Sequence, residues 1–347
     1  RRRTTLKDIA ELAGVSTVTV HKALYNKPGI AESTREKVLG LAREHNFTIN
    51  TAASSLKRRT FQFATLINEG TGEDRYFYPN LWKGLQAAEG VYKDFNVEIM
   101  KFGFSGDYTC QITELENILR EYGSDLDGLL TVAWHAQELN SILQTYAEAG
   151  IPVVLFNADT EGGCRVGYVG APARRIGRLA GELMSGFIGA RSRVVVLGGS
   201  HILQNHRDST FGFHAELKEK KPQTEIFELY DFYNKEKLIR NLSELLLKFS
   251  DIEGLYCTNA RNTLTMCEVV SSLGLSGRLK VVGSDVFKEL GPYFANDTIQ
   301  AVIWQNPEQQ AYKALELLYK HAMKQPYQEI EYVSFGIVMR NNFDFYL

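Results

Sequence analysis

Residues 5–26 read TLKDIAELAGVSTVTVHKALYN, and this stretch predicts two short amphipathic helices joined by a tight turn. Thr5 is placed to cap the first helix, with Asp8 three residues later completing a capping box. Gly14 follows where the chain must leave that helix, and Ser16 is expected to be the N-cap of the second. Apolar residues recur at helical spacing in the first helix, at Leu6, Ile9, Ala10 and Ala13.

The second helix of this pair has an inward and an outward face. Its inward side chains are Val20, Ala23 and Leu24, which leaves an outer face of Thr17, Val18, His21 and Lys22. A partly polar face of this kind suits base edges and phosphates when a helix enters the major groove of DNA. The pattern favours a helix-turn-helix, and the alternative is a small helical hairpin without that role.

The residues that follow extend this helical unit. A third helix is predicted from about Glu32 to Glu44, with Ser33 and Glu36 at its start and with Val38, Leu41 and Ala42 on its buried side. Residues 50–60, NTAASSLKRRT, are then small or polar and include three consecutive basic residues. We interpret this segment as a linker to the rest of the chain.

Charge is distributed unevenly along the chain. Residues 1–60 hold 12 Lys and Arg against 5 Asp and Glu, a balance of +7, whereas the remainder holds 27 against 36, a balance of −9. A basic head on an acidic body indicates a nucleic-acid module carried by a domain that needs no polyanion. The alternative is a basic terminus that is merely solvated.

Length and composition exclude several classes of protein. A chain of 347 residues with 44% hydrophobic and 23% charged residues suits two or three compact globular units. We expect a cytoplasmic protein, because there is neither an apolar signal region nor a run of ~20 apolar residues. The four cysteines lie far apart without CxxC spacing, which predicts neither a disulfide framework nor a metal site.

From Phe61 onward, short apolar runs alternate with amphipathic helical patterns. The runs FATLIN, VEIMKF, DGLLTVAW and IPVVLFN are separated by predicted helices, and a second series follows with VVVLGG, EIFELYDF, GLYCTN, KVVGSD and IQAVIWQ. This rhythm is typical of parallel sheets covered by helices on both faces. The sequence therefore predicts an α/β body in two similar halves.

The motifs LKDIAELAGVSTVTVHKAL, NKPGI, TREKV and AASSLK resemble the headpiece and hinge of the LacI/GalR family of sugar- and purine-responsive transcription regulators. The body resembles the core that this family shares with periplasmic sugar-binding proteins. The resemblance implies an all-α helix-turn-helix headpiece (residues 1–49), a hinge (50–60) and two Rossmann-like parallel-sheet subdomains of the periplasmic binding protein type I fold. These subdomains are expected at 61–169 with 307–332, and at 170–306 with 333–347.

The resemblance also implies a homodimer that reads a near-palindromic operator. It assigns base reading to Thr17, Val18 and Lys22, and it makes Leu56 a wedge for the minor groove. A solvated linker without a wedge is the alternative, and the chain has Ser54 and Ile49 where the family often has Arg and Pro. The full set of expected DNA-binding residues is Thr5, Ser16, Thr17, Val18, His21, Lys22, Asn26, Thr34, Ala53, Leu56 and Lys57.

A small sugar-like effector is expected between the two subdomains, because ligands of open parallel sheets bind beyond the carboxyl ends of strands. Aromatic rings stack on sugar C–H faces, and amides, carboxylates and Arg bind hydroxyls. Arg207 in particular falls on the family's arginine. The expected effector-binding residues are Tyr76, Phe77, Tyr78, Trp134, His135, Asn157, Asp159, Arg207, Phe232, Asn259, Asp285 and Gln305.

Some alternatives stay open at this point. Each ring taken alone is also compatible with ordinary core packing. Ala260 stands where the family usually has an aspartate after the Asn259 position, and Arg261 follows it. Whether the effector carries a phosphate or a carboxylate therefore stays open. A purine-responsive regulator and a transport-type sugar-binding protein are the rival functions. No GxSxG, GxxxxGK[ST] or HExxH motif is present, so we expect neither an enzyme nor a cofactor. The direction of the switch, induction or co-repression, is not encoded in these residues.

Overall fold

The computed structural model describes residues 4, 6–24, 28–45, 47, 59–160, 162–230 and 234–347, without the side chains of Leu6, His21 and Ala136. The chain divides into two compact units, with the main boundary between Arg59 and Thr60. Among the described residues, no helix combines the length and the apolar character needed to cross a membrane.

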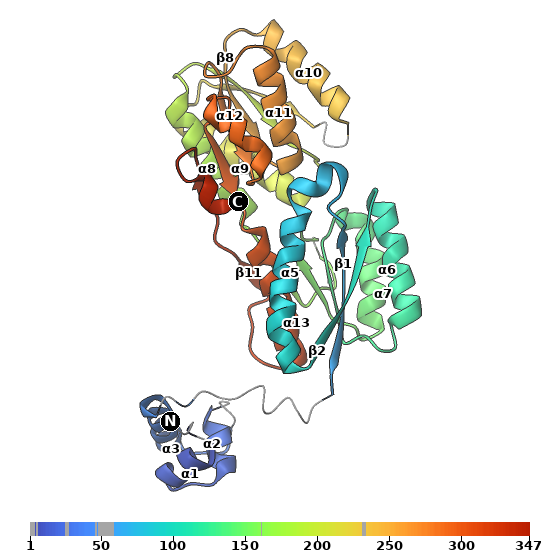
Figure 1. The fold of residues 1–347 in the computed structure, drawn as a ribbon, viewed down its shortest axis with the longest axis vertical. Coiled ribbons are helices and arrows are strands. Elements are labelled where there is room, and N and C mark those ends of the chain that lie inside the picture. Colours follow the sequence, from blue (N-terminus) through green and yellow to red (C-terminus); the bar gives the residue numbers. More distant parts are fainter. Residues whose placement is uncertain are drawn as a thin grey trace. The chain divides into compact units, whose positions relative to one another are not determined.

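The first unit contains the three predicted helices. They are α1 (Leu6–Ala13), α2 (Thr17–Leu24) and α3 (Glu32–Glu44), coloured blue in Figure 1. Their apolar faces meet in one small core, made by Ile9, Ala10, Ala13, Val20, Ala23 and Val38. The helical spacing of these residues in the sequence therefore predicts the packing of the unit correctly.

Local contacts fix the helix ends in this unit. Gly14 has a φ of +68°, the left-handed conformation that ends α1. The Ser16 hydroxyl accepts a hydrogen bond from the Thr19 backbone N–H at 3.1 Å, which confirms it as the N-cap of α2. Lys37 of α3 donates to the Ala13 carbonyl at 2.9 Å, and Arg35 donates to carbonyls at the end of α2. These cations satisfy carbonyls that helix ends leave without partners.

The second unit contains two sheets, each covered by helices on both faces (Figure 1). We call each sheet with its covering helices a lobe. In the first lobe, the sheet is fully parallel with the order β11-β5-β4-β3-β1-β2. Its helices are α5 (Tyr78–Tyr92) and α13 (Pro307–Ala322) on one face and α6 (Tyr108–Tyr122) and α7 (Ala136–Glu148) on the other. The strands are β1 (Phe61–Asn68), β2 (Val97–Phe104), β3 (Gly128–Thr131), β4 (Val153–Phe156), β5 (Gly167–Gly170) and β11 (Ile330–Tyr332).

In the second lobe, the sheet has the order β12-β10-β9-β8-β6-β7, and only β12 pairs antiparallel. Helices α8 (Ala173–Phe187) and α9 (Gln204–Lys220) cover one face, and α10 (Lys235–Lys248) and α11 (Ala260–Ser272) cover the other. The strands are β6 (Arg193–Leu197), β7 (Glu225–Leu229), β8 (Ile252–Cys257), β9 (Lys280–Ser284), β10 (Ala301–Trp304) and β12 (Gly336–Val338). The remaining elements are the short helices η1 (Gly72–Tyr76), η2 (Lys93–Phe95), η3 (Lys288–Leu290), α12 (Gly291–Ala295) and η4 (Phe343–Tyr346).

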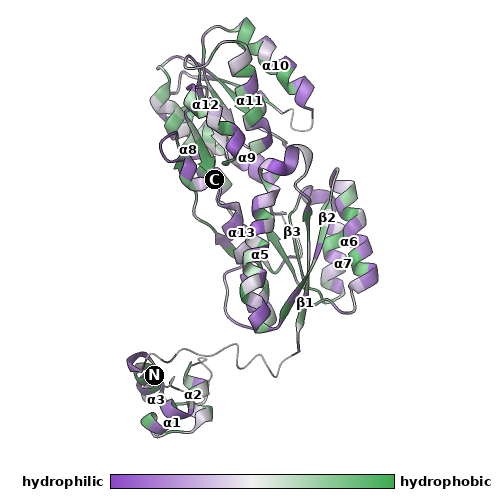
Figure 2. Ribbon diagram, viewed as in Figure 1, coloured by the Kyte–Doolittle hydropathy of each residue, from purple (hydrophilic) through white to green (hydrophobic). Residues whose placement is uncertain are grey.

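Burial explains why the central strands read as continuous apolar runs. Every residue of β3, β4 and β5 is buried, whereas most residues of the edge strands β2 and β7 are half-buried or exposed. Figure 2 shows the same contrast, with hydrophobic strands between helices that carry a hydrophilic outer side. Strands covered on both faces need no polar side, so their sequence loses the two-residue period.

The chain passes between the lobes three times. It leaves the first sheet after β5, returns after β10 and leaves again after β11. The sequence pattern predicts one helix at residues 212–219 (GFHAELKE) and another from Thr263. Both begin earlier in the structure, since α9 starts at Gln204 and α11 starts at Ala260. Both early starts place additional side chains at the ends of β6 and β8.

The contact between α8 and α9 depends on glycine. A Cβ built at Gly177 of α8 would lie 1.9 Å from the Ser209 carbonyl oxygen of α9, whereas a Cβ at Gly186, also in α8, meets no atom within 4 Å. Gly177→Ala is therefore expected to force the helices apart and to lower the free energy of unfolding by about 1–3 kcal/mol. Thermal unfolding of the full chain measures this effect.

Gly186→Ala is the matched control, because it changes the same residue type in the same helix. It is expected to be neutral or to stabilise by up to about 1 kcal/mol, since alanine has the higher helix propensity. Equal effects of the two substitutions would contradict the close helix contact.

Candidate effector cavity

The main candidate site is a cavity between the two lobes of the second unit. Its walls come from residues that follow β1, β3 and β4 in the first lobe and β6, β8, β9 and β10 in the second. Its water-accessible volume is about 60 Å³, which holds about five ordered water molecules. The lining residues are Glu73, Asp74, Tyr76, Phe77, Tyr78, Val132, Trp134, Asn157, Ala158, Leu203, Asn205, His206, Thr258, Asn259, Ala260, Arg261, Asp285 and Gln305.

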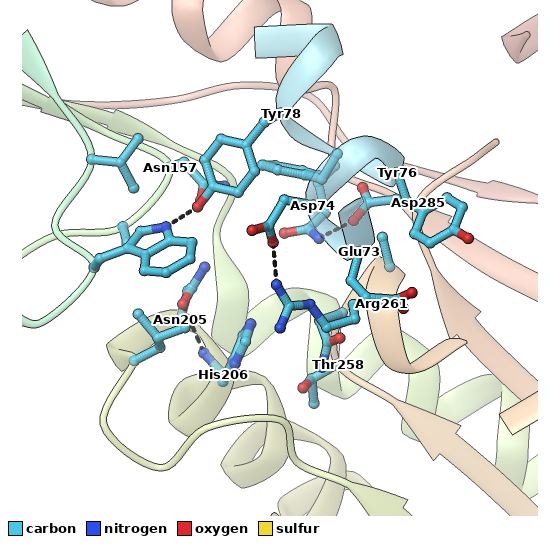
Figure 3. A pocket seen from close by; sticks show the side chains of 18 residues that line it. Glu73, Asp74, Tyr76, Tyr78, Asn157, Asn205, His206, Thr258, Arg261 and Asp285 are labelled. Atoms are coloured by element: carbon cyan, nitrogen blue, oxygen red, sulfur yellow. Dashed lines mark hydrogen bonds and ion pairs between the residues drawn. The ribbon is translucent and has the colours of Figure 1, made fainter. Parts of the chain in front are cut away.

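Aromatic side chains form the wall on the side of the first lobe. Tyr76, Phe77 and Tyr78 occupy the junction of η1 and α5. The Trp134 indole N–H donates to the Tyr78 hydroxyl, a contact drawn in Figure 3. This bond fixes two ring faces at the cavity.

An ion pair joins the two lobes across the cavity. Asp74 of η1 and Arg261 of α11 approach to 2.5 Å, and their side chains are only 15% and 17% exposed. Figure 3 shows this contact in the middle of the site. The second Asp74 oxygen accepts from the Asn68 amide at 3.1 Å, so the carboxylate is held from both sides. Such a pair orients donor and acceptor groups toward a bound ligand.

Two polar residues of the second lobe have specialised geometry. The Asn259 side-chain oxygen caps α11 by accepting from the Asn262 N–H at 2.9 Å, so its buried Nδ2, which has no hydrogen-bond partner among the described residues, is the group left for a ligand. Asp285 has a φ of +65° directly after β9 and is buried. Burial raises the pKa of its carboxyl group to about 7, although hydrogen bonds from Gln305 oppose this shift.

His206 is a buried neutral group at the same wall. Its Nδ1 accepts from the Ser200 backbone N–H at 3.1 Å, which assigns the ring proton to Nε2. Burial, assisted by the positive charge of Arg261, lowers the pKa of His206 to about 3. The imidazole therefore stays uncharged across the physiological range.

The structure brings most of the expected effector residues together at this cavity. The lining includes Tyr76, Phe77, Tyr78, Trp134, Asn157, Asn259, Asp285 and Gln305. Phe232 lies outside the described residues. His135 does not line the cavity and packs against the Tyr108 ring at 4.2 Å. Asp159 is also outside the lining, because it forms an ion pair with Arg165 at 2.6 Å.

Arg207 differs most from its expected place. Because α9 already begins at Gln204, Arg207 lies inside the first turns of a helix, where it is exposed. Its guanidinium donates to the carbonyls of His201 and Ile202 at 3.0 and 3.1 Å. The preceding residue, His206, lines the cavity instead, because side chains of neighbouring residues in a helix point about 100° apart.

Sequence reasoning missed two charged lining residues. Glu73 and Asp74 follow β1 in a polar segment that gives no signal beyond its position after a strand end. Arg261 is noticed in the sequence only as a departure from the family pattern, and its early position in α11 brings it to the cavity.

The expected DNA-binding residues lie in the first unit. Thr17 and Val18 are exposed on α2, with Val18 63% exposed, whereas Lys22 and Thr34 are half-buried. Ser16 is exposed, and its hydroxyl is engaged in the helix cap. Thr5, Asn26, Ala53, Leu56, Lys57 and the side chain of His21 lie outside the described residues.

No group of three or more His, Cys, Asp or Glu side chains with metal-site geometry occurs in the part of the chain that the structure describes. Cys257 and Cys267 are buried, and Cys110 is exposed.

The buried acid and imidazole predict opposite effects of pH on stability. Asp285 has a folded-state pKa above its usual 3.8, so its contribution to the free energy of unfolding falls as pH rises from about 4 to 7. His206 has a folded-state pKa below its usual 6.5, so its contribution rises as pH increases from about 3 to 6.5. The two slopes oppose each other over most of this range.

Single variants separate these contributions in thermal melts of the full chain between pH 4 and 7. Asp285→Asn is expected to become more stable relative to the parent protein as pH rises. His206→Gln is expected to gain relative stability as pH falls. Two relative melting curves without any pH dependence would show that neither group is buried as described.

Comparison with known proteins agrees with this two-unit organisation. The family model for bacterial regulatory proteins of the lacI family matches residues 5–50, and the model for a periplasmic binding protein domain matches residues 64–326. The chain is 34% identical over 161 residues to the probable HTH-type transcriptional repressor ExuR of Bacillus subtilis. The matched region covers 45% of this chain and 44% of ExuR. This match therefore spans less than half of that relative.

Two further matches extend over more of the chain. The HTH-type transcriptional regulator MalR of Streptococcus pneumoniae is 25% identical over 77% of this chain and 79% of its own length. A solute-binding protein of an ABC transporter from Agrobacterium vitis, solved with α-D-tagatopyranose, has a TM-score of 0.74 at 20% identity, over 82% of this chain and 96% of that one. The chain therefore belongs, over residues 64–326, to the family of periplasmic binding protein domains, and it carries a lacI-family domain at its N-terminus.

Proposed function

We propose that the protein is a sequence-specific DNA-binding transcription regulator, and that a small sugar in the cavity between the lobes controls its affinity for DNA. The single observation that carries the proposal is the joint presence of a helix-turn-helix unit and a polar, aromatic-walled cavity in one chain. Family membership supports it, because relatives bear the names of transcriptional repressors and regulators.

For the DNA-binding unit, we propose that α2 enters the major groove. Val18 is an exposed methyl-bearing side chain suited to a thymine methyl, and Lys22 suits guanine acceptors. One such unit covers a half-site, so we propose a homodimer on a near-palindromic operator. The hinge role of residues 50–60, including the Leu56 wedge, remains part of the proposal, and residues 50–58 lie outside the described structure.

For the effector, we propose one sugar ring. Space for about five waters suits a single sugar ring. The rings of Tyr78 and Trp134 provide apolar faces, Asp74 and Arg261 provide charged groups for hydroxyls, and Asp285 provides a buried carboxyl group. The sugar in the Agrobacterium vitis protein supports this class of ligand.

Two other functions use the same cavity. A purine would stack on the same rings, but it offers fewer hydroxyl donors for the carboxylates of Asp74 and Asp285. A transport-type binding protein would share the two lobes but would have no use for the helix-turn-helix unit. We therefore favour the sugar-responsive regulator.

The effector assignment predicts that Arg261 is needed for binding and that Arg207 is not. Arg261→Met removes a charged donor from the cavity, and Arg207→Met removes the same charge from an exposed site outside the lining. Affinity for the best sugar is expected to fall about 10- to 100-fold in the Arg261 variant, because hydrogen bonds to charged groups contribute about 1.5–3 kcal/mol. The Arg207 variant is expected to change affinity less than twofold.

The measurement is a thermal-shift screen of the full chain with D-glucose, D-galactose, D-ribose, D-arabinose, D-glucuronate and D-glucose 6-phosphate, and with the purines adenine and guanine, followed by titration of the strongest ligand. Stronger loss in the Arg207 variant would move the site away from this cavity. Stabilisation by purines and by none of the sugars would favour the purine-responsive alternative.

A further inference from the structure

A chain of side-chain hydrogen bonds connects the two lobes beside the cavity. Asn157, after β4 of the first lobe, donates through Nδ2 to Oε1 of Gln310 in α13 at 3.2 Å. Gln310 donates through Nε2 to the Gln305 carbonyl at 2.7 Å. Gln305 in turn donates through its own Nε2 to Oδ2 of Asp285, after β9 of the second lobe, at 2.9 Å. Asn157, Gln305 and Asp285 line the cavity, whereas Gln310 does not.

Chemistry dictates the direction of this chain. The Gln305 carbonyl can only accept, so Gln310 must turn its amide nitrogen toward it and its oxygen toward Asn157. Asn157 must then present its own amide nitrogen to Gln310, which leaves its side-chain oxygen for other partners. Every donor therefore points from the first lobe toward the second, and the chain ends on a carboxylate.

The end of the chain leaves an acceptor at the cavity. Asp285 uses Oδ2 for Gln305, and its other oxygen, Oδ1, is buried and has no hydrogen-bond partner among the described residues. A buried oxygen of this kind is costly unless a donor reaches it. A ligand hydroxyl at this wall would supply that donor.

Gln310 itself is poorly explained by packing. It is completely buried in the first turn of α13, where an apolar residue would fill the same space without the cost of burying an amide. Both ends of its amide are bonded, the oxygen to Asn157 after β4 and the nitrogen to the Gln305 carbonyl in the segment that crosses from β10 to α13. Gln310 thus ties the crossing segment to the wall of Asn157, and the Gln305 side chain ties the same segment to Asp285 on the other wall.

We propose that Gln310 is a positioning residue for the effector site: it sets Asn157 and Asp285 as acceptors on opposite walls and holds the walls in register, so the effector must offer hydroxyl donors to both. This inference rests on the proposed function only in naming the ligand. The placement of the two walls is a property of the protein without effector.

The test is hydrogen exchange of the full chain without ligand, compared among variants. The reporter amides are those of Asn157 and Asp285, which bond to Val169 and Ile303 within their own sheets. Gln310→Met removes both amide bonds at similar volume and is expected to raise exchange about five- to tenfold at both reporters. Gln309→Met is the matched control on the adjacent, half-buried position and is expected to change neither.

A second variant keeps the test informative if Gln310→Met does not fold. Asn157→Asp removes the donor, so Gln310 is expected to turn its nitrogen toward the new carboxylate and to release the Gln305 carbonyl. Exchange should then rise about fivefold at Asp285, on the other lobe. Increases confined to α13 in the first variant, or to residues 155–159 in the second, would overturn the positioning role.

This result is independent of sugar binding. If no sugar stabilises the protein but hydrogen exchange changes as expected, the coupling of the walls stands and only the class of ligand is wrong. If a sugar binds as expected but hydrogen exchange is unchanged in the Gln310 variant, only the role of Gln310 is wrong.

Discussion

The ion pair between Asp74 and Arg261 constrains how the two lobes are arranged around the cavity. Both charges are largely shielded from water, so separating the lobes would expose and rehydrate them, and leaving one without the other would be costly. The pair also occupies the wall where a ligand would bind. A sugar that bonds to both groups would therefore change the free energy of opening the cavity, which is what an effector must do to shift a conformational equilibrium.

The segments that cross between the lobes add a second constraint on their arrangement. Three crossing segments join the lobes, and the chain Asn157–Gln310–Gln305–Asp285 runs through one of them. Because each of these bonds has a fixed donor and acceptor, a displacement of one cavity wall must lengthen or break a bond in this chain. In the proposed regulator, this rigidity would transmit ligand binding to the relative position of the lobes, and from there to the paired DNA-binding units of a dimer.

The sequence predicts those parts of the structure that depend on local chemistry. Gly14 and Ser16 mark a helix end and a helix start because their roles need only a few neighbouring residues, and the apolar runs identify the buried strands because both faces are covered. Arg207 lies outside the cavity lining because helix α9 begins at Gln204, eight residues before the segment 212–219 that the sequence pattern indicates, and one position along a helix separates a buried from an exposed side chain. Asp74 and Gln310 could not be found in this way, since their partners lie 187 and 153 residues away in the chain.

The central claim is that sugar in the cavity controls sequence-specific DNA binding, and selection of DNA from a random pool by the full chain tests it most directly. Selection would be run without ligand and with the sugar that stabilises the protein most. The account predicts enrichment of an inverted repeat in one condition and a change in its affinity of at least fivefold in the other, in keeping with typical allosteric coupling. An enriched repeat whose affinity is the same with and without every sugar, or no enriched sequence at all, would contradict it.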